Sequence, residues 1–169
     1  MKNKLLMMSL VFVGCAAYAQ HDHAGHSANK NTQNGITFKD KKLGTAYEHY
    51  LHLKNALVAS DPMEARAGAN KLKDALADAK APASVVELAS KIAGVSGVED
   101  QRKVFSTLTG EMKTLVSGGK LSAGSIYWEY CPMAFNNTGA YWLSSEREIK
   151  NPYFGSRMMK CGSVKETIQ

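Results

Sequence analysis

Apolar side chains recur at steps of three and four residues from Asp40 onward, which is the spacing of one face of an α-helix. The first such face predicts a helix that ends at Asp61-Pro62 and contains Leu43, Tyr47, Tyr50, Leu51, Leu57 and Val58. Asp61 is also the predicted N-cap of a second helix, with Pro62 at its first position and Glu64 completing a capping box.

The same capping chemistry predicts the starts of two further helices. Ser84 with Glu87 opens a short third helix that runs through Ile92, and Ser96 with Glu99 opens a longer fourth one. The apolar face of the fourth helix contains Val98, Phe105, Leu108, Met112 and Leu115, and Gly118-Gly119 ends it. Four amphipathic helices with short connections predict an up-down antiparallel four-helix bundle.

After Lys120 the pattern changes. Ile126, Trp128 and Tyr130 alternate, residues 136–139 form a turn cluster, and residues 140–143 resume an apolar and aromatic run, which together predict a short β-hairpin. Asn151-Pro152 and Gly155 then favour irregular backbone that leads to the last methionines and Cys161. The predicted fold is therefore mainly α: an antiparallel four-helix bundle, a C-terminal short β-hairpin, and an irregular segment that carries cysteine and methionine.

The first residues have the pattern of a targeting segment. Lys2 and Lys4 precede the apolar run 5–13, and Ala17-Tyr18-Ala19 fits a cleavage site, so residues 1–19 are predicted to be a secretory signal peptide. Gly14-Cys15 offers the alternative of lipidation at Cys15. We expect an exported, periplasmic protein, or else a membrane-anchored lipoprotein. Residues 20–39 show no apolar period and predict a flexible histidine-rich tail, which leaves residues 40–169 as a single helical domain.

Charge excludes one class of partner. The whole chain has a net charge of +6, from 21 basic and 15 acidic residues; removal of Lys2 and Lys4 with the signal leaves 19 basic residues and a charge of +4. Such a small excess does not indicate nucleic-acid binding.

Two cysteines, Cys131 and Cys161, remain after either processing route. In an oxidising compartment they can form a disulfide. They are also close in sequence to Met133, Met158 and Met159, and thiolate with thioether favours Cu(I), whereas zinc rarely takes thioether, so copper ranks above zinc. Methionine is in addition a common filler of irregular cores.

Histidines form a second group of candidate ligands. His21, His23 and His26 lie within six residues in the tail, and imidazole suits Cu(II), Zn(II) or Ni(II); a solvated polar tail is the alternative. His49 and His52 share a helix face away from the apolar stripe, which favours surface histidines. No phosphate loop, GxSxG elbow or HExxH pattern is present, so we do not predict an enzyme.

Four C-terminal stretches resemble the domain of unknown function 3347 family: Tyr130 to Phe135, Gly139 to Ser144, Asn151 to Gly155 and Met159 to Gly162. The resemblance extends from about Leu43 to the C-terminus. That family includes short exported bacterial proteins and domains fused to periplasmic adaptors of heavy-metal efflux pumps, which implies a soft metal and an adaptor or other envelope partner.

The Tyr-Cys-Pro-Met stretch also resembles the small heavy-metal-binding domain of the same adaptors, whose sulfur ligands imply copper or a similar ion. That domain has Cys-x-x-Cys-Gly-Met where this chain has a single Cys-Gly at Cys161, so the implied ligands are restricted to Cys131, Met133 and Cys161.

The leading hypothesis is an exported copper-binding accessory protein whose site contains Cys131, Met133, Met159 and Cys161, with His21, His23 and His26 as a weaker capture arm. The alternative is a disulfide-stapled interaction module without a metal, in which Trp128, Tyr130, Tyr141 and Trp142 form a surface for a partner.

Overall fold

The computed structural model describes residues 35–118 and 120–169. Predictions that fall on residues 1–34, namely the signal peptide, Cys15 and the three tail histidines, lie outside the described residues. The elements, in chain order, are β1 (Thr37–Phe38), α1 (Lys41–Ala59), α2 (Pro62–Asp78), α3 (Ala83–Gly94), α4 (Val98–Val116), β2 (Leu121–Ala123), β3 (Ile126–Cys131), α5 (Ala134–Asn137), β4 (Ala140–Ser144), the 3-10 turn η1 (Gly155–Met158) and β5 (Ser163–Ile168). Within the described ranges, no helix is long and apolar enough to cross a membrane.

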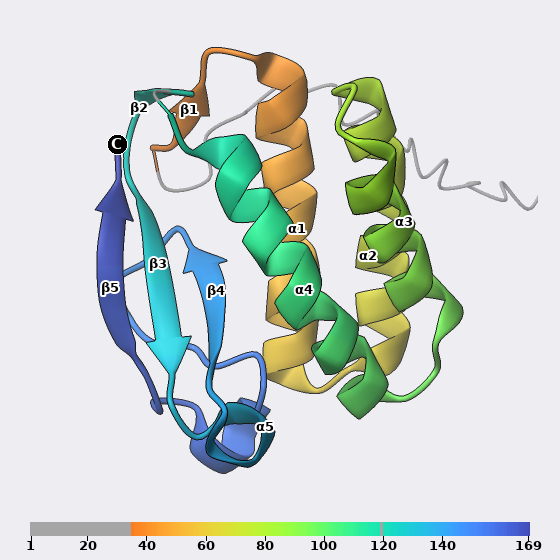
Figure 1. Cartoon of the computed structure of the whole chain (residues 1–169), viewed down its shortest axis with the longest axis vertical. Coiled ribbons are helices and arrows are strands. Elements are labelled where there is room, and N and C mark those ends of the chain that lie inside the picture. The colour runs from red at the N-terminus through yellow and green to blue at the C-terminus, as the bar shows by residue number, and fades with distance from the viewer. Residues whose placement is uncertain (1–34, 119) are drawn as a thin grey trace, which may run out of the picture.

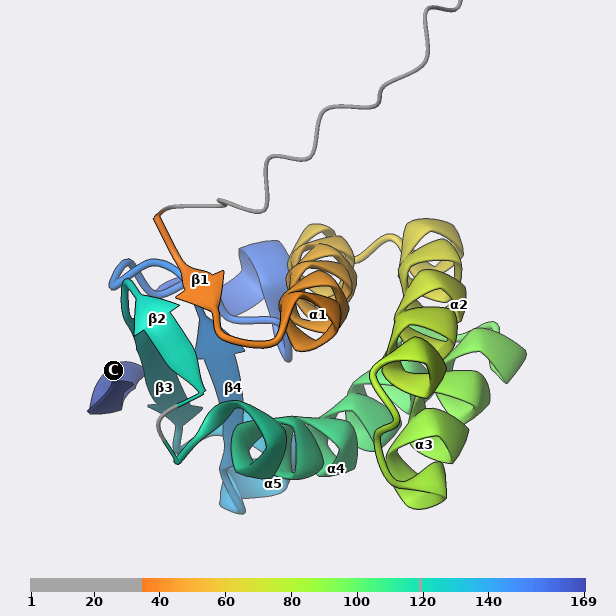
Figure 2. The same ribbon diagram turned by 90° about the horizontal axis from the view of Figure 1, so that it is seen from above.

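The chain is mainly helical, with a short antiparallel pair formed by β1 before the helices and β2 after them, and a three-stranded antiparallel sheet in the C-terminal part (Figure 1). Helix α1 packs against α2, α2 against α3, and α3 against α4. Helices α1 and α4 stand beside the sheet, and α2 and α3 lie on their far side (Figure 2). The predicted helices are therefore confirmed as elements.

The junction between α1 and α2 forms as the sequence predicts. Ser60 ends α1 in the left-handed conformation, and the side chain of Asp61 accepts hydrogen bonds from the backbone N–H groups of Met63 and Glu64. Pro62 occupies the first turn of α2, where its missing N–H costs nothing because that group would have no helical partner.

The three predicted capping boxes are wrong in detail. Glu64 does not return to Asp61; its carboxylate pairs with His52 of α1. Helix α3 starts at Ala83 after Pro82, and α4 starts at Val98 after Gly97, so Ser84 and Ser96 cap neither helix. Proline and glycine are compatible with the extended backbone that precedes each helix, and they fix the starts without a side-chain cap.

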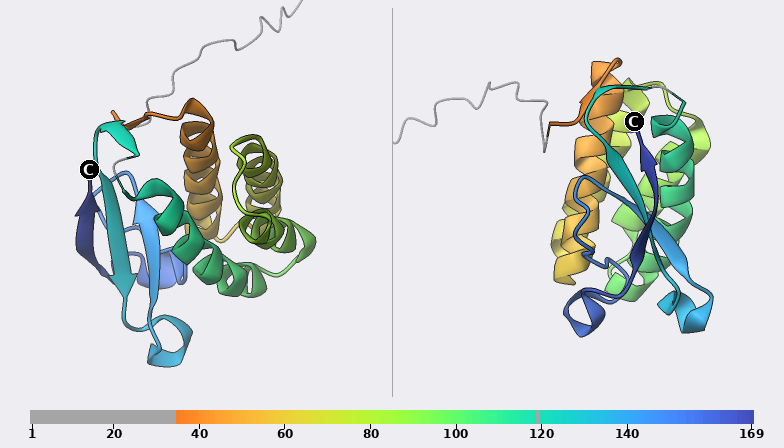
Figure 3. Two further views of the ribbon diagram at one scale, coloured as in Figure 1. Left: turned by 45° about the horizontal axis from the view of Figure 1, so that its top comes forward. Right: turned by 90° about the vertical axis from the view of Figure 1, so that its left-hand side faces the viewer.

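The predicted hairpin is confirmed and belongs to a larger sheet. Strands β3 and β4 pair antiparallel, and β5 pairs antiparallel with the other edge of β3, giving the order β4-β3-β5. Strand β5, which begins at Ser163 after the predicted irregular segment, was not predicted. The short pair β1-β2 was also not predicted (Figure 3), and because β1 and the buried Ile36 lie within residues 20–39, the predicted flexible tail does not extend to residue 39.

A line of aromatic rings joins the helices to the sheet. Tyr47 stacks on Tyr50, Tyr50 on Phe105, and Phe105 contacts Tyr153, whose ring in turn lies 6.0 Å from that of Trp142. All five rings are at least nine-tenths buried. Because these rings come from α1, α4, β4 and the segment before η1, the helices and the C-terminal part share one core.

Candidate sulfur site at the end of strand β3

The structure brings the two cysteines together. The Sγ atoms of Cys131 and Cys161 lie 2.8 Å apart, and both are free thiols. Cys131 is the last residue of β3, and Tyr130 pairs in register with Ser163, the first residue of β5. The antiparallel pairing of β5 with β3 thus carries Cys161 to the end of β3 although the two cysteines are thirty residues apart.

The two thiols differ in their surroundings. Cys131 is fully buried, whereas Cys161 is partly exposed and gives the pair its access to solvent. Burial raises the pKa of the Cys161 thiol, the neighbouring Cys131 raises it further, and the backbone N–H of Met133 lowers it by hydrogen bonding. At neutral pH the Cys161 thiol is therefore held in its protonated form until a metal or an oxidant removes the proton.

The methionines adjoin the pair on both sides. Met133, two residues after Cys131, is 45% exposed and lines a groove of about 400 Å³ with Phe154 and Arg157. Met159, two residues before Cys161, is partly buried, and its carbonyl oxygen accepts a hydrogen bond from the N–H of Asn151. Across residues 35–118 and 120–169, no group of three or more His, Cys, Asp or Glu side chains is placed to hold a metal.

The helical histidines contribute nothing to this site. His52 Nε2 lies 2.5 Å from Glu64 Oε1, across the α1–α2 interface. His49 lines a separate hollow with Lys42 and Lys71, and its pKa is lowered by burial first and then by Lys71.

Three of the four predicted surface aromatics lie together on the outer face of the sheet. Tyr141 stacks on Trp128 at 4.8 Å and lies 4.4 Å from the ring of Tyr130, and it is 40% exposed. Trp142 points to the opposite face and is fully buried. The inclusion of Trp142 in an exposed partner surface is therefore wrong, because successive residues of a strand alternate between the two faces.

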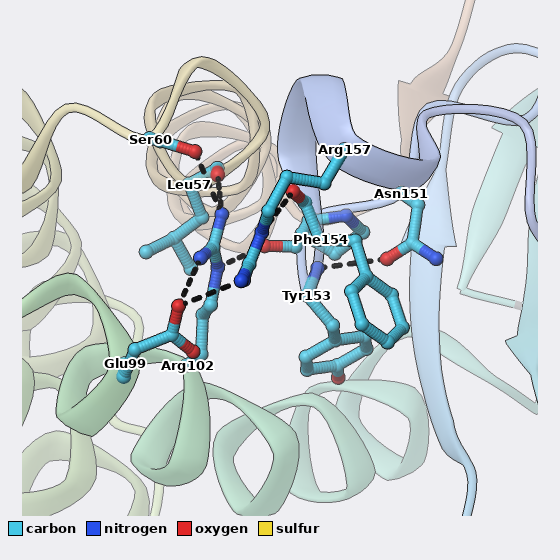
Figure 4. A network of polar contacts seen from close by, with 9 residues as sticks. Leu57, Ser60, Glu99, Arg102, Asn151, Tyr153, Phe154 and Arg157 are labelled. Carbon is cyan, nitrogen blue, oxygen red and sulfur yellow. Dashed lines mark hydrogen bonds and ion pairs between the residues drawn. The ribbon is translucent and has the colours of Figure 1, made fainter. Parts of the chain in front are cut away.

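Two residues that the sequence did not single out hold the Cys161 segment in place. Asn151 is fully buried, and its side-chain amide donates a hydrogen bond of 2.8 Å to the backbone oxygen of Cys161. Arg102 of α4, only 2% exposed, donates to the backbone oxygens of Pro152 and Leu57 and to Ser60 Oγ (Figure 4). The Asn-Pro pair marks Asn151 as a turn residue, but nothing in the sequence distinguishes Arg102 from an exposed helical arginine.

Glu129 is the other unexpected residue near the pair. It lies two positions before Cys131 on the same buried face of β3, and no hydrogen bond of standard geometry reaches either carboxylate oxygen, although the indole N–H of Trp142 is nearby. Burial raises the pKa of this carboxyl to about 7, while Lys54 and the indole N–H of Trp142 act in the opposite direction. Alternation within a strand predicts that a residue between Trp128 and Tyr130 faces away from them, so the burial of Glu129 follows from the predicted hairpin.

The comparison with protein families identifies the helical part of the chain. Residues 46–124 match the model of the family described as "Protein of unknown function (DUF3347)". Residues 46–124 therefore belong to this domain family. The predicted membership is confirmed, yet the match extends from α1 to just after β2 and ends before Cys131, so the four C-terminal stretches that carry the resemblance lie beyond it. Neither the curated proteins nor the solved structures that were compared give a match.

Proposed function

We propose that this protein is an exported copper-handling accessory protein whose reduced Cys131–Cys161 pair binds one Cu(I) ion. The observation that carries the proposal is the 2.8 Å separation of the two Sγ atoms, which come from opposite ends of a thirty-residue segment. Two thiolates with thioethers nearby are a soft donor set that prefers Cu(I) to zinc.

The order of the sulfur residues supports the same metal. Met133 follows Cys131 by two positions and Met159 precedes Cys161 by two, so each thiol has a thioether on an adjoining turn of chain. In this proposal one or both methionines complete a site of two to four sulfurs. The exposed side chain of Met133 and the partly exposed Cys161 lie on the route by which an ion arrives or leaves.

Metal binding requires a small movement. With a metal–sulfur bond of about 2.3 Å, two sulfurs on one tetrahedral ion lie about 3.8 Å apart, so the pair must open by about 1 Å. Cys161 lies between η1 and β5, outside regular structure, whereas Cys131 is held in β3. Cys161 is therefore the thiol that moves outward, and a movable ligand suits transfer of the ion to a partner.

The remaining parts of the proposal have roles around this site. Helices α1 to α4 act as an antiparallel four-helix scaffold, and His21, His23 and His26 form a weaker capture arm for copper. The partner is a heavy-metal efflux adaptor or another envelope protein. The protein acts in the periplasm, free or anchored through Cys15, and it carries the ion without catalysing a reaction.

Anaerobic titration with Cu(I) against a chromophoric chelator tests the proposal. We expect one tight equivalent for the reduced protein and a loss of at least a hundredfold in affinity for Cys131→Ser or Cys161→Ser. Met133→Leu should weaken binding less, and Met63→Leu, at an exposed methionine of α2, is its matched control. Unchanged affinity in both cysteine variants would remove the site, and Zn(II) titrated in parallel should bind more weakly.

A second candidate function is a disulfide-stapled interaction module, and the same distance favours it. Sulfurs at 2.8 Å are closer than a shared metal allows, and they need only approach to about 2.05 Å to form a disulfide. The stacked rings of Trp128, Tyr141 and Tyr130 would then contact a partner. Intact mass after alkylation distinguishes the two: a protein that is two protons lighter, resists alkylation and ignores copper is the module.

A further inference from the structure

Asn151 uses every polar group that it possesses. Its N–H donates to the carbonyl oxygen of Met159 at 2.9 Å, and its side-chain Nδ2 donates to the carbonyl oxygen of Cys161 at 2.8 Å. Its Oδ1 accepts from the N–H of Tyr153 at 2.8 Å, and its own carbonyl oxygen accepts from the N–H of Gly155 at 3.1 Å. A fully buried side chain with this many bonds has one fixed orientation.

Two of these bonds close the turn 151–155 on itself, and the other two hold the segment that carries Cys161. An asparagine side chain that accepts from the N–H two residues later forms an Asx-turn, which makes the local backbone rigid. The bonds to Met159 and Cys161 then fix the carbonyl oxygens on both sides of Lys160. Asn151 therefore determines the position and orientation of Cys161 relative to the end of β3.

The turn is itself attached to the helices. Arg102 Nε donates to the carbonyl oxygen of Pro152 at 2.7 Å, and Nη2 of the same guanidinium donates at 2.9 Å to Leu57 at the end of α1. A side chain at Gly155 would place its Cβ 2.5 Å from Ser60 Oγ, and the φ of +58° at Gly155 also favours glycine. The turn thus lies directly against the α1–α2 junction. Figure 4 shows Arg102 bonded to Ser60 at that junction, with Asn151 on the side of the turn away from Ser60.

We propose that Asn151, anchored to the helices through Pro152 and Arg102, is the positioning residue that presents Cys161 to Cys131. It touches neither sulfur; it acts by reducing the number of positions that the Cys161 segment can adopt. The inference deepens the proposed function, since it concerns the same thiol pair, and it holds for metal transfer and for disulfide formation alike. The contribution of Asn151 can be expressed as the effective concentration of the Cys161 thiol near the Cys131 thiol.

Asn151→Asp is the most selective variant. The aspartate keeps an oxygen for the N–H of Tyr153 but replaces the donor Nδ2 with an oxygen that faces the carbonyl of Cys161. Gln101→Glu is the matched control, because it makes the same amide-to-acid change at a buried side chain that donates to the backbone oxygens of Pro62 and Val95 and not to the Cys161 segment. Asn151→Ser is a second variant, with an oxygen that can serve the turn but is too short to reach Cys161.

The readout is the equilibrium constant of the Cys131–Cys161 pair against reduced and oxidised glutathione, measured by alkylation and intact mass, with circular dichroism to confirm folding. We expect Asn151→Asp and Asn151→Ser to lower this constant at least tenfold and Gln101→Glu to change it less than threefold. A residue with only a structural role would destabilise the oxidised and reduced proteins equally and leave the constant unchanged, which would overturn the proposal. If Asn151→Asp fails to fold, Asn151→Ser decides.

The copper titration separates this proposal from the proposed function. A wild-type protein that ignores Cu(I) while the Asn151 variants still lower the glutathione constant refutes copper handling and retains the positioning role. Tight Cu(I) binding with an unchanged glutathione constant in both Asn151 variants refutes the positioning role alone.

Discussion

The guanidinium of Arg102 donates a hydrogen bond of 2.7 Å from Nε to the backbone oxygen of Pro152. This bond joins α4 to the segment that leads to Cys161, across fifty residues of sequence. The same side chain also binds Leu57 and Ser60 at the end of α1, so three separate parts of the chain meet at one buried cation.

Replacement of Arg102 by methionine should therefore be strongly destabilising. It leaves the buried carbonyl oxygen of Pro152 without a donor, and it also removes the charged hydrogen bonds to Ser60 and to Leu57, whose oxygen keeps the N–H of Ser60. An unsatisfied buried group costs about 1–3 kcal/mol and a hydrogen bond from a charged donor contributes about 1.5–3 kcal/mol, so we expect a loss of about 3 kcal/mol or more in urea unfolding. Glu99→Gln is the control. Its carboxylate pairs with Arg102 but is 59% exposed, and an exposed pair contributes less than about 1 kcal/mol. Equal losses in the two variants would show that the ion pair, and not the buried hydrogen bonds, anchors the segment.

Oxidation of the thiol pair should stabilise the fold. A bond that closes the thirty-residue loop between Cys131 and Cys161 lowers the entropy of the unfolded chain, which corresponds to about 3–4 kcal/mol. We expect the unfolding free energy measured without reductant to exceed that measured with reductant by this amount. The Cys131→Ser and Cys161→Ser proteins should show no dependence on reductant, and a dependence that persisted in either variant would contradict the assignment of this pair.

The sequence predicts the helices well because an amphipathic helix repeats its signal over several turns, as the face from Leu43 to Leu57 does. An individual helix cap is less predictable, because it depends on a single hydrogen bond. Glu64 is compatible with a capping box, but it pairs with His52 on the neighbouring helix. A sequence pattern contains no information about that second helix.

Strand β5 and the anchor at Arg102 could not be predicted for a related reason. In β5 most side chains are exposed, including Lys165 and Glu166, so the strand lacks an apolar alternation. Charged residues of this kind protect an edge strand from pairing with other chains. Arg102 is one of several charged residues at the start of α4, and only the tertiary fold places the C-terminal turn over it. Of the candidate site, the two cysteines were predictable, but the turn that positions one of them was not.

Glu129 should make stability depend on pH. The folded protein raises the pKa of this carboxyl from 4.5 to about 7 because burial disfavours its charge, and Tyr47, Lys54, Trp142 and Glu146 surround it. The folded state therefore binds the proton more tightly than the unfolded state. The contribution of Glu129 to stability is complete below pH 4.5 and is lost as the pH rises through about 7.

Comparison with Glu129→Gln isolates this contribution, because all other groups titrate in both proteins. We expect the unfolding free energy of Glu129→Gln, relative to that of wild type, to increase between pH 4.5 and 7. The increase should be about 1.4 kcal/mol for each unit by which folding raises the pKa of Glu129. Glu111→Gln, at an exposed position of α4, should show no such trend. A constant difference from pH 4.5 to 8 would mean that Glu129 titrates alike in both states.

The turn after Met133 contains left-handed backbone that glycine would relieve. Phe135, Asn136 and Asn137 have φ values of 50°, 56° and 67°, and the side chain of Asn136 is exposed. Because the left-handed region costs a residue with a Cβ about 1–2 kcal/mol, and asparagine less, we expect Asn136→Gly to stabilise the protein by about 0.5–1 kcal/mol and Asn136→Ala to destabilise it by a similar amount.

Gly110→Ala provides the opposite case for the same measurement. Gly110 lies within α4, and a Cβ there would meet no atom within 4 Å, so alanine should stabilise the helix by about 0.5–1 kcal/mol. Positions 136 and 110 thus predict opposite results: glycine should be more stable than alanine at position 136 and less stable at position 110, which thermal or urea unfolding resolves. If Asn136→Ala were as stable as Asn136→Gly, the turn would not hold residue 136 in the left-handed region, and the path of the chain from Met133 to β4 would have to be different.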